Sequence, residues 1–155
     1  MMQTALLVVD IQTGTLAPLI GKETLLKNVN ELIDHFHHEE LPVIFIKKVG
    51  YGELSKHLHR EANDPLVTKV PMNTFKAPEF QTVMKEQGLG NFVVVGLMSN
   101  ACVQATCKGA LAEKFPVTVI EDAHDSVIKP MRNAWNKKLK GLGVTTMTTK
   151  EYIEK

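Results

Sequence analysis

Three side chains of complementary chemistry follow apolar runs in this sequence: Asp10, Lys69 and Cys102. A thiol can attack a carbonyl carbon, a carboxylate can take up the thiol proton, and an ammonium can hold the carboxylate. Each residue alone also has a structural explanation, as a turn acceptor, a solvated strand end or a packed core thiol. Their combination indicates a nucleophilic site that transfers an acyl group.

The two cysteines differ in their predicted surroundings. Cys102 lies between the apolar run "VVVGL" and an Ala-rich segment, at a strand-to-helix junction. Peptide dipoles and free amides at a helix N-terminus favour a thiolate, so we expect a lowered pKa and reaction with iodoacetamide well below pH 8. Cys107 lies five residues further along the same predicted helix, about 140° around its axis. We expect it to pack in the core, and the spacing excludes a disulfide between the two.

The elements that would position these side chains alternate along the chain. Amphipathic helices are predicted over residues 22–40, through Phe80 to Met84 with a C-cap at Gly88, over 101–114, and through Met131, Trp135 and Leu139. Continuous apolar runs, typical of strands covered on both faces, occupy residues 4–10, 42–47, 66–70, 91–96, 116–122 and 143–148. This alternation predicts one doubly wound α/β domain over residues 1–155, with its site at the carboxyl ends of the strands.

Composition excludes several classes of partner. Lys and Arg number 18 against 17 Asp and Glu, and no basic run exceeds two residues, so we expect no nucleic-acid binding. The N-terminal apolar run is too short to span a bilayer and has no signal-peptide pattern. We therefore expect a cytoplasmic protein that does not bind membranes. The long irregular segment 48–65 is predicted to form a lid or part of a partner contact.

Four ordered motifs make the chain resemble the isochorismatase-like cysteine hydrolases, which include nicotinamidases and N-carbamoylsarcosine amidase. They are "ALLVVDIQ" at the start, "KVPMNTF" from Lys69 to Phe75, "VVVGLMSNACVQAT" around Cys102, and "VTVIEDAHDS" after it. The resemblance covers nearly the whole chain. It implies six parallel strands in the order 3-2-1-4-5-6, flanked by helices, and an Asp10, Lys69 and Cys102 triad.

The resemblance also implies a cis peptide between Leu97 and Met98, with the amides of Met98 and Cys102 forming an oxyanion hole. One geometric question follows from the strand order. Lys69 would lie two strand spacings, about 10 Å, from Asp10. We therefore expect the chain after Lys69 to bend back over the sheet, or the strand order to differ.

The expected activity is hydrolysis of a carbon–nitrogen bond in a small amide or N-carbamoyl compound, through a thioester on Cys102. A nicotinamidase or pyrazinamidase activity and a non-enzymatic binding module on the same fold are the alternatives. His124 offers a rival Cys–His–Asp arrangement, because histidine is a common general base. The Asp-x-His motif of metal-binding relatives is missing after the second strand. His57 and His59 are interpreted as a polar loop, so no metal and no cofactor are expected.

Residues near the predicted strand ends supply candidate pocket walls. A homo-oligomer, a dimer or larger, is expected to complete the site around a small-molecule substrate, because the chain is short. The candidate wall residues are Gln12, Leu16, Tyr51, Phe75 and Trp135.

Overall fold

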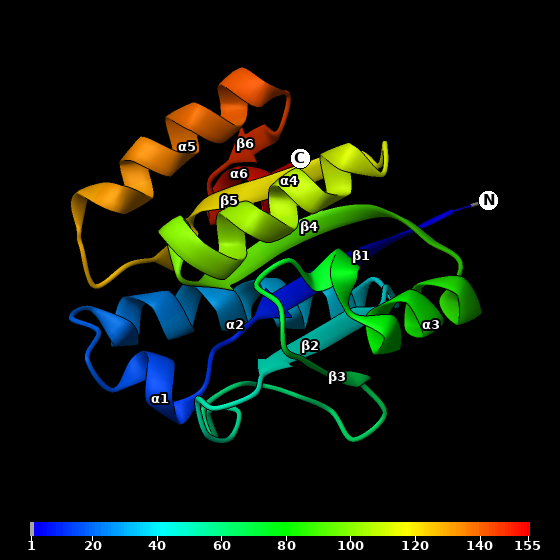
Figure 1. The fold of residues 1–155 in the computed structure, drawn as a ribbon, viewed down its shortest axis with the longest axis horizontal. Helices are drawn as coiled ribbons and strands as arrows, with labels where there is room; N and C mark the ends of the chain where they lie inside the picture. The colour runs from blue at the N-terminus through cyan, green and yellow to red at the C-terminus, as the bar shows by residue number, and fades with distance from the viewer. Residues whose placement is uncertain (1) are drawn as a thin grey trace.

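The computed structural model describes residues 2–155 and contains a six-stranded parallel sheet between two layers of helices (Figure 1). The strand order is β3-β2-β1-β4-β5-β6, which confirms the predicted fold and topology. The strands are β1 (Gln3–Val9), β2 (Val43–Lys48), β3 (Leu66–Lys69), β4 (Leu89–Leu97), β5 (Val117–Asp125) and β6 (Thr145–Met147). The helices are α1 (Thr13–Leu16), α2 (Lys22–His38), α3 (Pro78–Gln87), α4 (Gln104–Ala112), α5 (Pro130–Leu142) and α6 (Thr149–Glu154).

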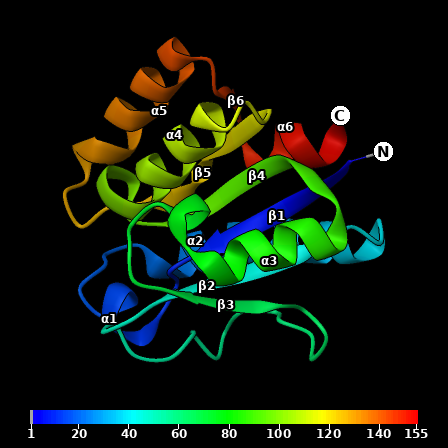
Figure 2. The same cartoon turned by 45° about the vertical axis from the view of Figure 1, so that its right-hand side comes forward.

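Both faces of the sheet are covered, which explains why the strands are continuously apolar. In β1, Ala5, Leu7 and Val9 face the core beneath α3, α4 and α5, and the alternate residues Leu6 and Val8 face α2 and α6. All five are fully buried. Figure 2 shows the two helical layers on opposite sides of the strands. A half-exposed sheet would have produced alternating polar residues instead.

Two short helices and one helix start differ from the sequence prediction. α1 and α6 have only 4 and 6 residues, too few for an apolar periodicity to be recognised. The α4 helix starts at Gln104 rather than near residue 101, because Ser99–Val103 forms a kinked turn in which Ala101 has φ −130° and ψ −105°. Cys102 therefore lies in this turn, two residues before the helix.

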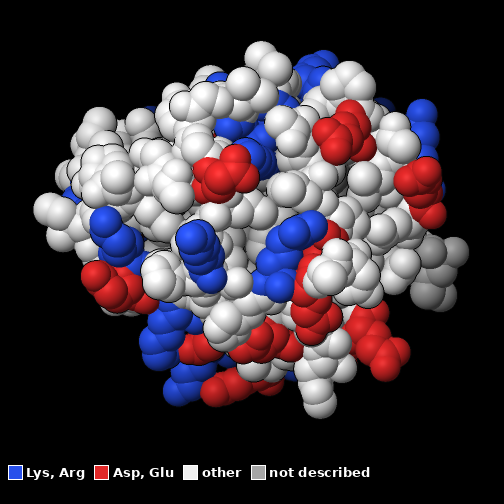
Figure 3. Space-filling model, turned by 90° about the horizontal axis from the view of Figure 1, so that it is seen from below, with Lys and Arg blue, Asp and Glu red and all other residues white. Residues whose placement is uncertain are grey.

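The described residues contain no helix long and apolar enough to cross a membrane. Figure 3 shows Lys and Arg side chains interspersed with Asp and Glu on the lower face of the molecule. That face carries no large surface of a single charge sign. Mixed charge of this kind is typical of a solvated protein surface rather than of a nucleic-acid footprint.

Gly96 marks the closest approach of β4 to β1. Its Cα is paired with that of Val9, and its φ is +126°, a conformation that side-chain-bearing residues rarely adopt. A Cβ at this position would overlap the main-chain carbonyl of Val9. Asp10 follows Val9 directly. The close approach of Gly96 to Val9 therefore also fixes the position of the main chain at which Asp10 begins.

Replacing Gly96 by alanine is expected to lower the free energy of unfolding by about 3 kcal/mol. Backbone strain and overpacking each cost about 1 to 3 kcal/mol. Urea denaturation followed by circular dichroism measures the change. Gly141→Ala is the matched control, because Gly141 lies in α5 with no atom within 4 Å of an added Cβ. Alanine there should stabilise the helix by up to about 1 kcal/mol. Equal stabilities of the two variants would contradict this explanation.

Candidate active site

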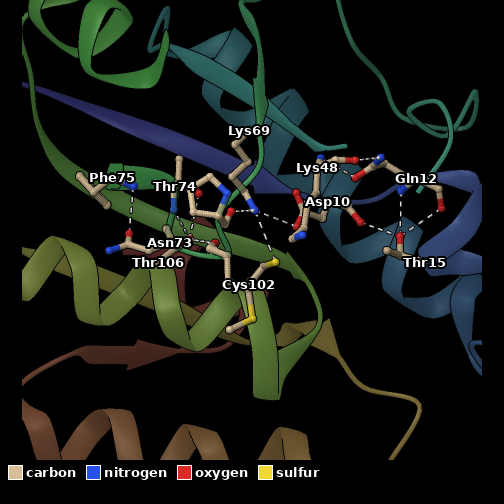
Figure 4. Close-up of polar contacts among 12 residues, drawn as sticks. Asp10, Gln12, Thr15, Lys48, Lys69, Asn73, Thr74, Phe75, Cys102 and Thr106 are labelled. Carbon is tan, nitrogen blue, oxygen red and sulfur yellow. Dashed lines mark hydrogen bonds and ion pairs between the residues drawn. The ribbon is translucent and has the colours of Figure 1, made fainter. Parts of the chain in front are cut away.

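Asp10, Lys69 and Cys102 meet in one buried cluster (Figure 4). The Lys69 Nζ lies 3.1 Å from Oδ2 of Asp10 and 3.4 Å from Sγ of Cys102. It donates a third hydrogen bond, of 3.0 Å, to the carbonyl of Pro71. The relative exposures of the three residues are only 2%, 2% and 5%. A carboxylate, an ammonium and a thiol are thus brought within contact of one another and largely removed from water.

A tight turn after β1 holds Asp10 in place. Its φ is +52°, in the left-handed region that aspartate tolerates better than most residues. The Asp10 N–H donates to the carbonyl of Ile46 at 3.0 Å, and the Thr15 hydroxyl donates to the Asp10 carbonyl at 2.6 Å. The main chain on both sides of the carboxylate is therefore fixed, and its side chain is directed toward Lys69 and Cys102.

Lys69 reaches Asp10 through its side chain. The β3 strand is at the sheet edge and β2 separates it from β1, as the predicted order requires. The strand order is unchanged, and the long Lys69 side chain closes the remaining gap to a 3.1 Å contact with Asp10. The chain after Lys69 also bends back over the sheet, which confirms the first of the two expected alternatives: the Thr74 N–H donates to the Thr106 hydroxyl in α4 at 3.2 Å, and the two hydroxyls lie 2.8 Å apart.

The surroundings of Cys102 differ from the sequence prediction in one chemical respect. Burial raises the pKa of its thiol to about 12, and the neighbouring Asp10 carboxylate adds to the rise, against the opposing effect of Lys69. The predicted lowering of the pKa was therefore wrong, because burial of the thiol, together with the neighbouring carboxylate, outweighs the effect of Lys69. At neutral pH the resting thiol keeps its proton. The pKa of Cys107, which is fully buried, is raised as well.

Asp10 has the properties of a proton acceptor for that thiol. Burial raises the pKa of its carboxyl above the usual value, and the Lys69 ammonium opposes part of the rise. Its Oδ1 is buried and accepts no hydrogen bond from the described residues. One carboxylate oxygen is thus held by Lys69 while the other retains free lone pairs. A general base works best when its pKa is closer to neutrality than that of an ordinary aspartate.

A cavity of about 320 Å³ opens onto this cluster. We call it the Cys102 cavity. Asp10, Lys48 and Cys102 form part of its wall, and apolar groups including Met72, Met98 and Val127 form much of the rest. Most of its lining surface is apolar, so the site suits a small organic molecule of limited polarity near the thiol.

Among the predicted wall residues, Tyr51 lines the Cys102 cavity. Gln12 does not, because its fully buried side-chain amide is bonded to main-chain groups of Lys48 and Gly52 at 2.9 Å each. Leu16 lies under a different surface hollow, formed by α1, the start of α2 and residues 52–57. Gln12 therefore supports the wall residue Lys48 from behind, whereas Leu16 packs in the core, and the predicted roles of both as pocket walls were wrong.

Phe75 and Trp135 also lie away from the cavity. Phe75 packs edge-on against Phe80 and Phe92, with ring centroids 5.1 and 5.0 Å away. Trp135 packs on the core from α5, and the ammonium of Lys138 lies 4.8 Å from its ring centroid. The predicted roles as pocket walls were wrong, because spacing from a strand end does not determine the direction of an aromatic side chain.

The Leu97–Met98 peptide bond is cis. Both residues line the Cys102 cavity, together with Ala101 from the kinked turn. The turn is closed by hydrogen bonds from the N–H groups of Ala101 and Val103 to the Met98 carbonyl, 3.0 and 3.1 Å long. The main chain from Leu97 to Cys102 therefore wraps around one end of the cavity, where an oxyanion is predicted.

His124 does not take the role of base suggested by the rival interpretation. Its Nδ1 lies 2.6 Å from the Ser99 hydroxyl and its Nε2 lies 2.7 Å from Oδ1 of Asn136. Asn136 donates its amide to Glu121, so its oxygen accepts from Nε2 and leaves Nδ1 to accept from Ser99. Burial lowers the pKa of His124 to about 4. A neutral His124 thus supports the kinked turn from behind.

The predicted histidine pair does not form a shared ligand site. His59 pairs with Asp34 at 2.9 Å, whereas His57 contributes main-chain hydrogen bonds to Ser55 and Asn30. These contacts agree with the interpretation of a polar loop.

A different group of metal-ligand side chains, which the sequence analysis missed, lies at the amino ends of the strands. His37 places Nε2 at 2.8 Å from Asp64 and Nδ1 at 3.4 Å from Glu61. The two ring nitrogens face different carboxylates, so the cluster has the geometry of an ion-pair network.

Comparison with known proteins matches residues 4–151 to the isochorismatase domain. The chain is 27% identical to the isochorismatase family protein YddQ of Bacillus subtilis, over 99% of this chain and 100% of that protein. Its fold resembles an isochorismatase-like hydrolase from Alkaliphilus metalliredigens, with a TM-score of 0.88, 22% identity and coverage of 99% and 96%. It also resembles the YcaC gene product of Escherichia coli, an octameric hydrolase of unknown specificity, with a TM-score of 0.89, 23% identity and coverage of 97% and 78%.

Proposed function

The chain belongs to the isochorismatase family, and on this premise we propose that it is a cysteine hydrolase acting on a non-peptide carbon–nitrogen bond. The substrate is a small amide or N-carbamoyl compound. The observation that carries the proposal is the contact of one buried ammonium, that of Lys69, with both the Asp10 carboxylate and the Cys102 sulfur. These groups border a cavity large enough for such a molecule.

Acylation begins with transfer of the Cys102 thiol proton to Asp10. The sulfur attacks the carbonyl carbon, and the N–H groups of Met98 and Cys102 hold the resulting oxyanion. The intermediate collapses when Asp10 returns the proton to the nitrogen, so that the carbon–nitrogen bond breaks and ammonia or an amine departs. A thioester on Cys102 remains.

Deacylation uses the same carboxylate. Asp10 removes a proton from water, the hydroxide adds to the thioester carbon, and the carbon–sulfur bond breaks. The released sulfur takes the proton back from Asp10, and the acid product leaves. Lys69 keeps Asp10 ionised between the two half-reactions and fixes its direction through the 3.1 Å contact.

The raised pKa values support a mechanism in which the thiol proton moves to Asp10 only during turnover, immediately before the attack. A thiol with a pKa of about 12 contains very little thiolate before the reaction starts. Once its proton has been removed, however, its sulfur is strongly nucleophilic. A buried Asp10 with a raised pKa is a correspondingly stronger base. Proton transfer within the cluster therefore replaces the preformed thiolate that the sequence predicts.

We further propose that the protein assembles as a homo-oligomer. Three of the exposed large apolar side chains, Tyr51, Met72 and Val127, line the Cys102 cavity. Exposed apolar side chains gathered at a functional cavity are typical of a protein contact. The octameric state of the E. coli hydrolase is in keeping with this proposal.

The activity is tested by measuring ammonia release from a panel of small primary amides and N-carbamoyl compounds. We expect at least one of them to be hydrolysed. Acid quenching during turnover should trap an acyl group on Cys102, visible as a mass increase on the peptide that contains it. Ammonia release without a covalent adduct, or with an adduct on Cys107, would argue against the thioester mechanism. No hydrolysis across the panel would overturn the assignment to carbon–nitrogen bonds.

A further inference from the structure

Lys48 is a charged group of the Cys102 cavity without an ion-pair partner. Asp10 in the same wall is paired with Lys69, whereas no carboxylate among residues 2–155 forms an ion pair with Lys48. Its neighbour Lys47 is satisfied by Glu53, 2.7 Å away. The two consecutive lysines therefore differ in their pairing: the Lys47 ammonium is bound to a carboxylate, whereas the Lys48 ammonium at the cavity is free to bind a ligand.

The main chain of Lys48 is held rigidly. The Gln12 side chain accepts a 2.9 Å hydrogen bond from the Lys48 N–H and donates one of 2.9 Å to the Lys48 carbonyl. Gln12 also donates to the carbonyl of Gly52 at 2.9 Å. Between these anchored points, Tyr51 places its ring 5.4 Å from the Lys48 ammonium. The ammonium thus projects from a fixed base beside an aromatic wall, which lowers the entropic cost of binding a ligand there.

The charges of the cavity do not balance. With Cys102 protonated, the charges of Asp10 and Lys69 cancel, and Lys48 leaves one net positive charge in a mostly apolar wall. An unpaired charge in such surroundings favours a ligand of opposite charge more strongly than it would in open water. Lys48, Asp10 and Cys102 line the same cavity, and Figure 4 draws all three in one view.

We propose that Lys48 binds an anionic group of the substrate, so that the enzyme acts on small amides carrying a carboxylate at the end away from the scissile bond. This inference rests on the proposed function. In the reaction, R–CO–NH₂ and water give R–COO⁻ and NH₄⁺. The bond broken is the amide carbon–nitrogen bond, and the substrate's own carboxylate is unchanged. A monoanionic amide acid is thereby converted to a dicarboxylate, and the apolar wall receives the linker between the two ends.

Lys48 also acts on Asp10, and the test must separate this effect from the binding of an anionic substrate. It favours the ionised form of Asp10, with a smaller influence on the carboxyl pKa than Lys69. Loss of that effect alone would slow every substrate equally. Loss of an anion site would slow only anionic substrates, so the deciding measurement is a ratio between an anionic substrate and its neutral isostere.

The first experiment compares succinamate with 4-methylpentanamide, in which an isopropyl group replaces the carboxylate. Lys48→Met is expected to lower kcat/KM for succinamate relative to the neutral amide by about 10- to 100-fold. Lys47→Met, the matched control, should leave this ratio unchanged because Lys47 is paired with Glu53. An equal loss for both amides in Lys48→Met, or a wild-type enzyme that hydrolyses only the neutral amide, would overturn the inference and leave the proposed function intact.

The second experiment needs no turnover. Iodoacetate and iodoacetamide have the same shape and alkylate Cys102 with loss of iodide and of the thiol proton, but only iodoacetate is anionic. We measure the ratio of their rates at Cys102 by peptide mass spectrometry. Dividing one rate by the other cancels any change in the thiol pKa.

Lys48→Met is expected to lower the iodoacetate-to-iodoacetamide ratio at least fivefold, and Lys48→Glu to lower it further. An unchanged ratio in both variants, or no reaction of Cys102 with either reagent, would refute the anion site. If the enzyme hydrolysed no amide, but the iodoacetate-to-iodoacetamide ratio still depended on Lys48, the anion site would stand and the proposed function would be wrong.

Discussion

Replacing Cys102 by alanine is expected to lower the hydrolytic kcat by at least about 10⁴-fold while leaving the fold intact. Without the sulfur no thioester can form, and direct attack by water has only Asp10 and the oxyanion-holding amides to assist it. The remaining side chain is smaller and apolar, so no buried charge is left unpaired. Steady-state ammonia release measures the activity, and thermal unfolding checks the fold.

Cys107→Ala is the matched control for this prediction. Like Cys102, Cys107 forms no disulfide; it lies in α4 with its side chain fully buried in the core, and it does not line the Cys102 cavity. Removing its sulfur should cost a modest amount of stability and little activity. If the two variants lost activity equally, the loss would have to be attributed to packing, and the nucleophilic role of Cys102 would be refuted.

Replacing Lys69 by methionine is expected to lower the free energy of unfolding by about 3 to 5 kcal/mol and to remove most activity. Breaking a buried ion pair leaves an uncompensated charge, and Lys69 and Asp10 are each exposed by no more than 2%. Urea denaturation at several pH values measures the stability. A buried position makes the expected loss far larger than that for a surface pair.

The loss should also depend on pH in a defined direction. Burial raises the pKa of folded Asp10 above its unfolded value. Between those two values the folded state binds more protons than the unfolded state, so stability falls as pH rises through that window. Without Lys69 the folded pKa rises further, and the window extends to higher pH. The variant should therefore be relatively more stable in acid, and the acidic limb of any residual activity should move to higher pH.

Two further variants separate charge from packing in this result. The double variant Asp10→Asn with Lys69→Met removes both charges and should recover at least half of the lost stability. Lys27→Met breaks the exposed 2.6 Å pair with Glu31 and is expected to cost no more than about 0.5 kcal/mol. A Lys69→Met variant as stable as Lys27→Met would show that the buried contact contributes nothing.

Much of the fold could be predicted because the sheet is covered on both faces. Five consecutive buried residues from Ala5 to Val9 produce an apolar run with clear ends, and a polar residue directly after such a run stands at the carboxyl edge. This reasoning found Asp10, whereas Cys102 was found from its place at a strand-to-helix junction five residues after Leu97. The strand predicted for residues 116–122 continues to Asp125, which makes His124 a strand residue packed behind the site.

Other features of the site depend on side-chain direction and burial, which a linear pattern does not contain. Phe75 lies six residues after Lys69 in a recognisable motif, yet its ring packs in the aromatic core. Lys48 was missed as a cavity residue, although it comes directly after the strand predicted for residues 42–47 and is the last residue of the observed β2. The raised pKa of Cys102 follows from desolvation by the complete tertiary structure. A search for every charged residue at a strand end would have found Lys48.

The three side-chain hydrogen bonds of Gln12 imply that substrate selectivity and proton transfer depend on different parts of the active site. Its amide joins the turn that carries Asp10 to the two ends of a short segment, Lys48 and Gly52, through main-chain atoms alone. These hydrogen bonds to main-chain atoms do not depend on the side chains that lie between Lys48 and Gly52. The side chain of Tyr51, which lines the Cys102 cavity, can therefore be exchanged, and with it the selectivity of the cavity, while the proton-transfer machinery keeps its geometry. Substrate preference and reaction chemistry are in this way free to diverge independently on a single scaffold.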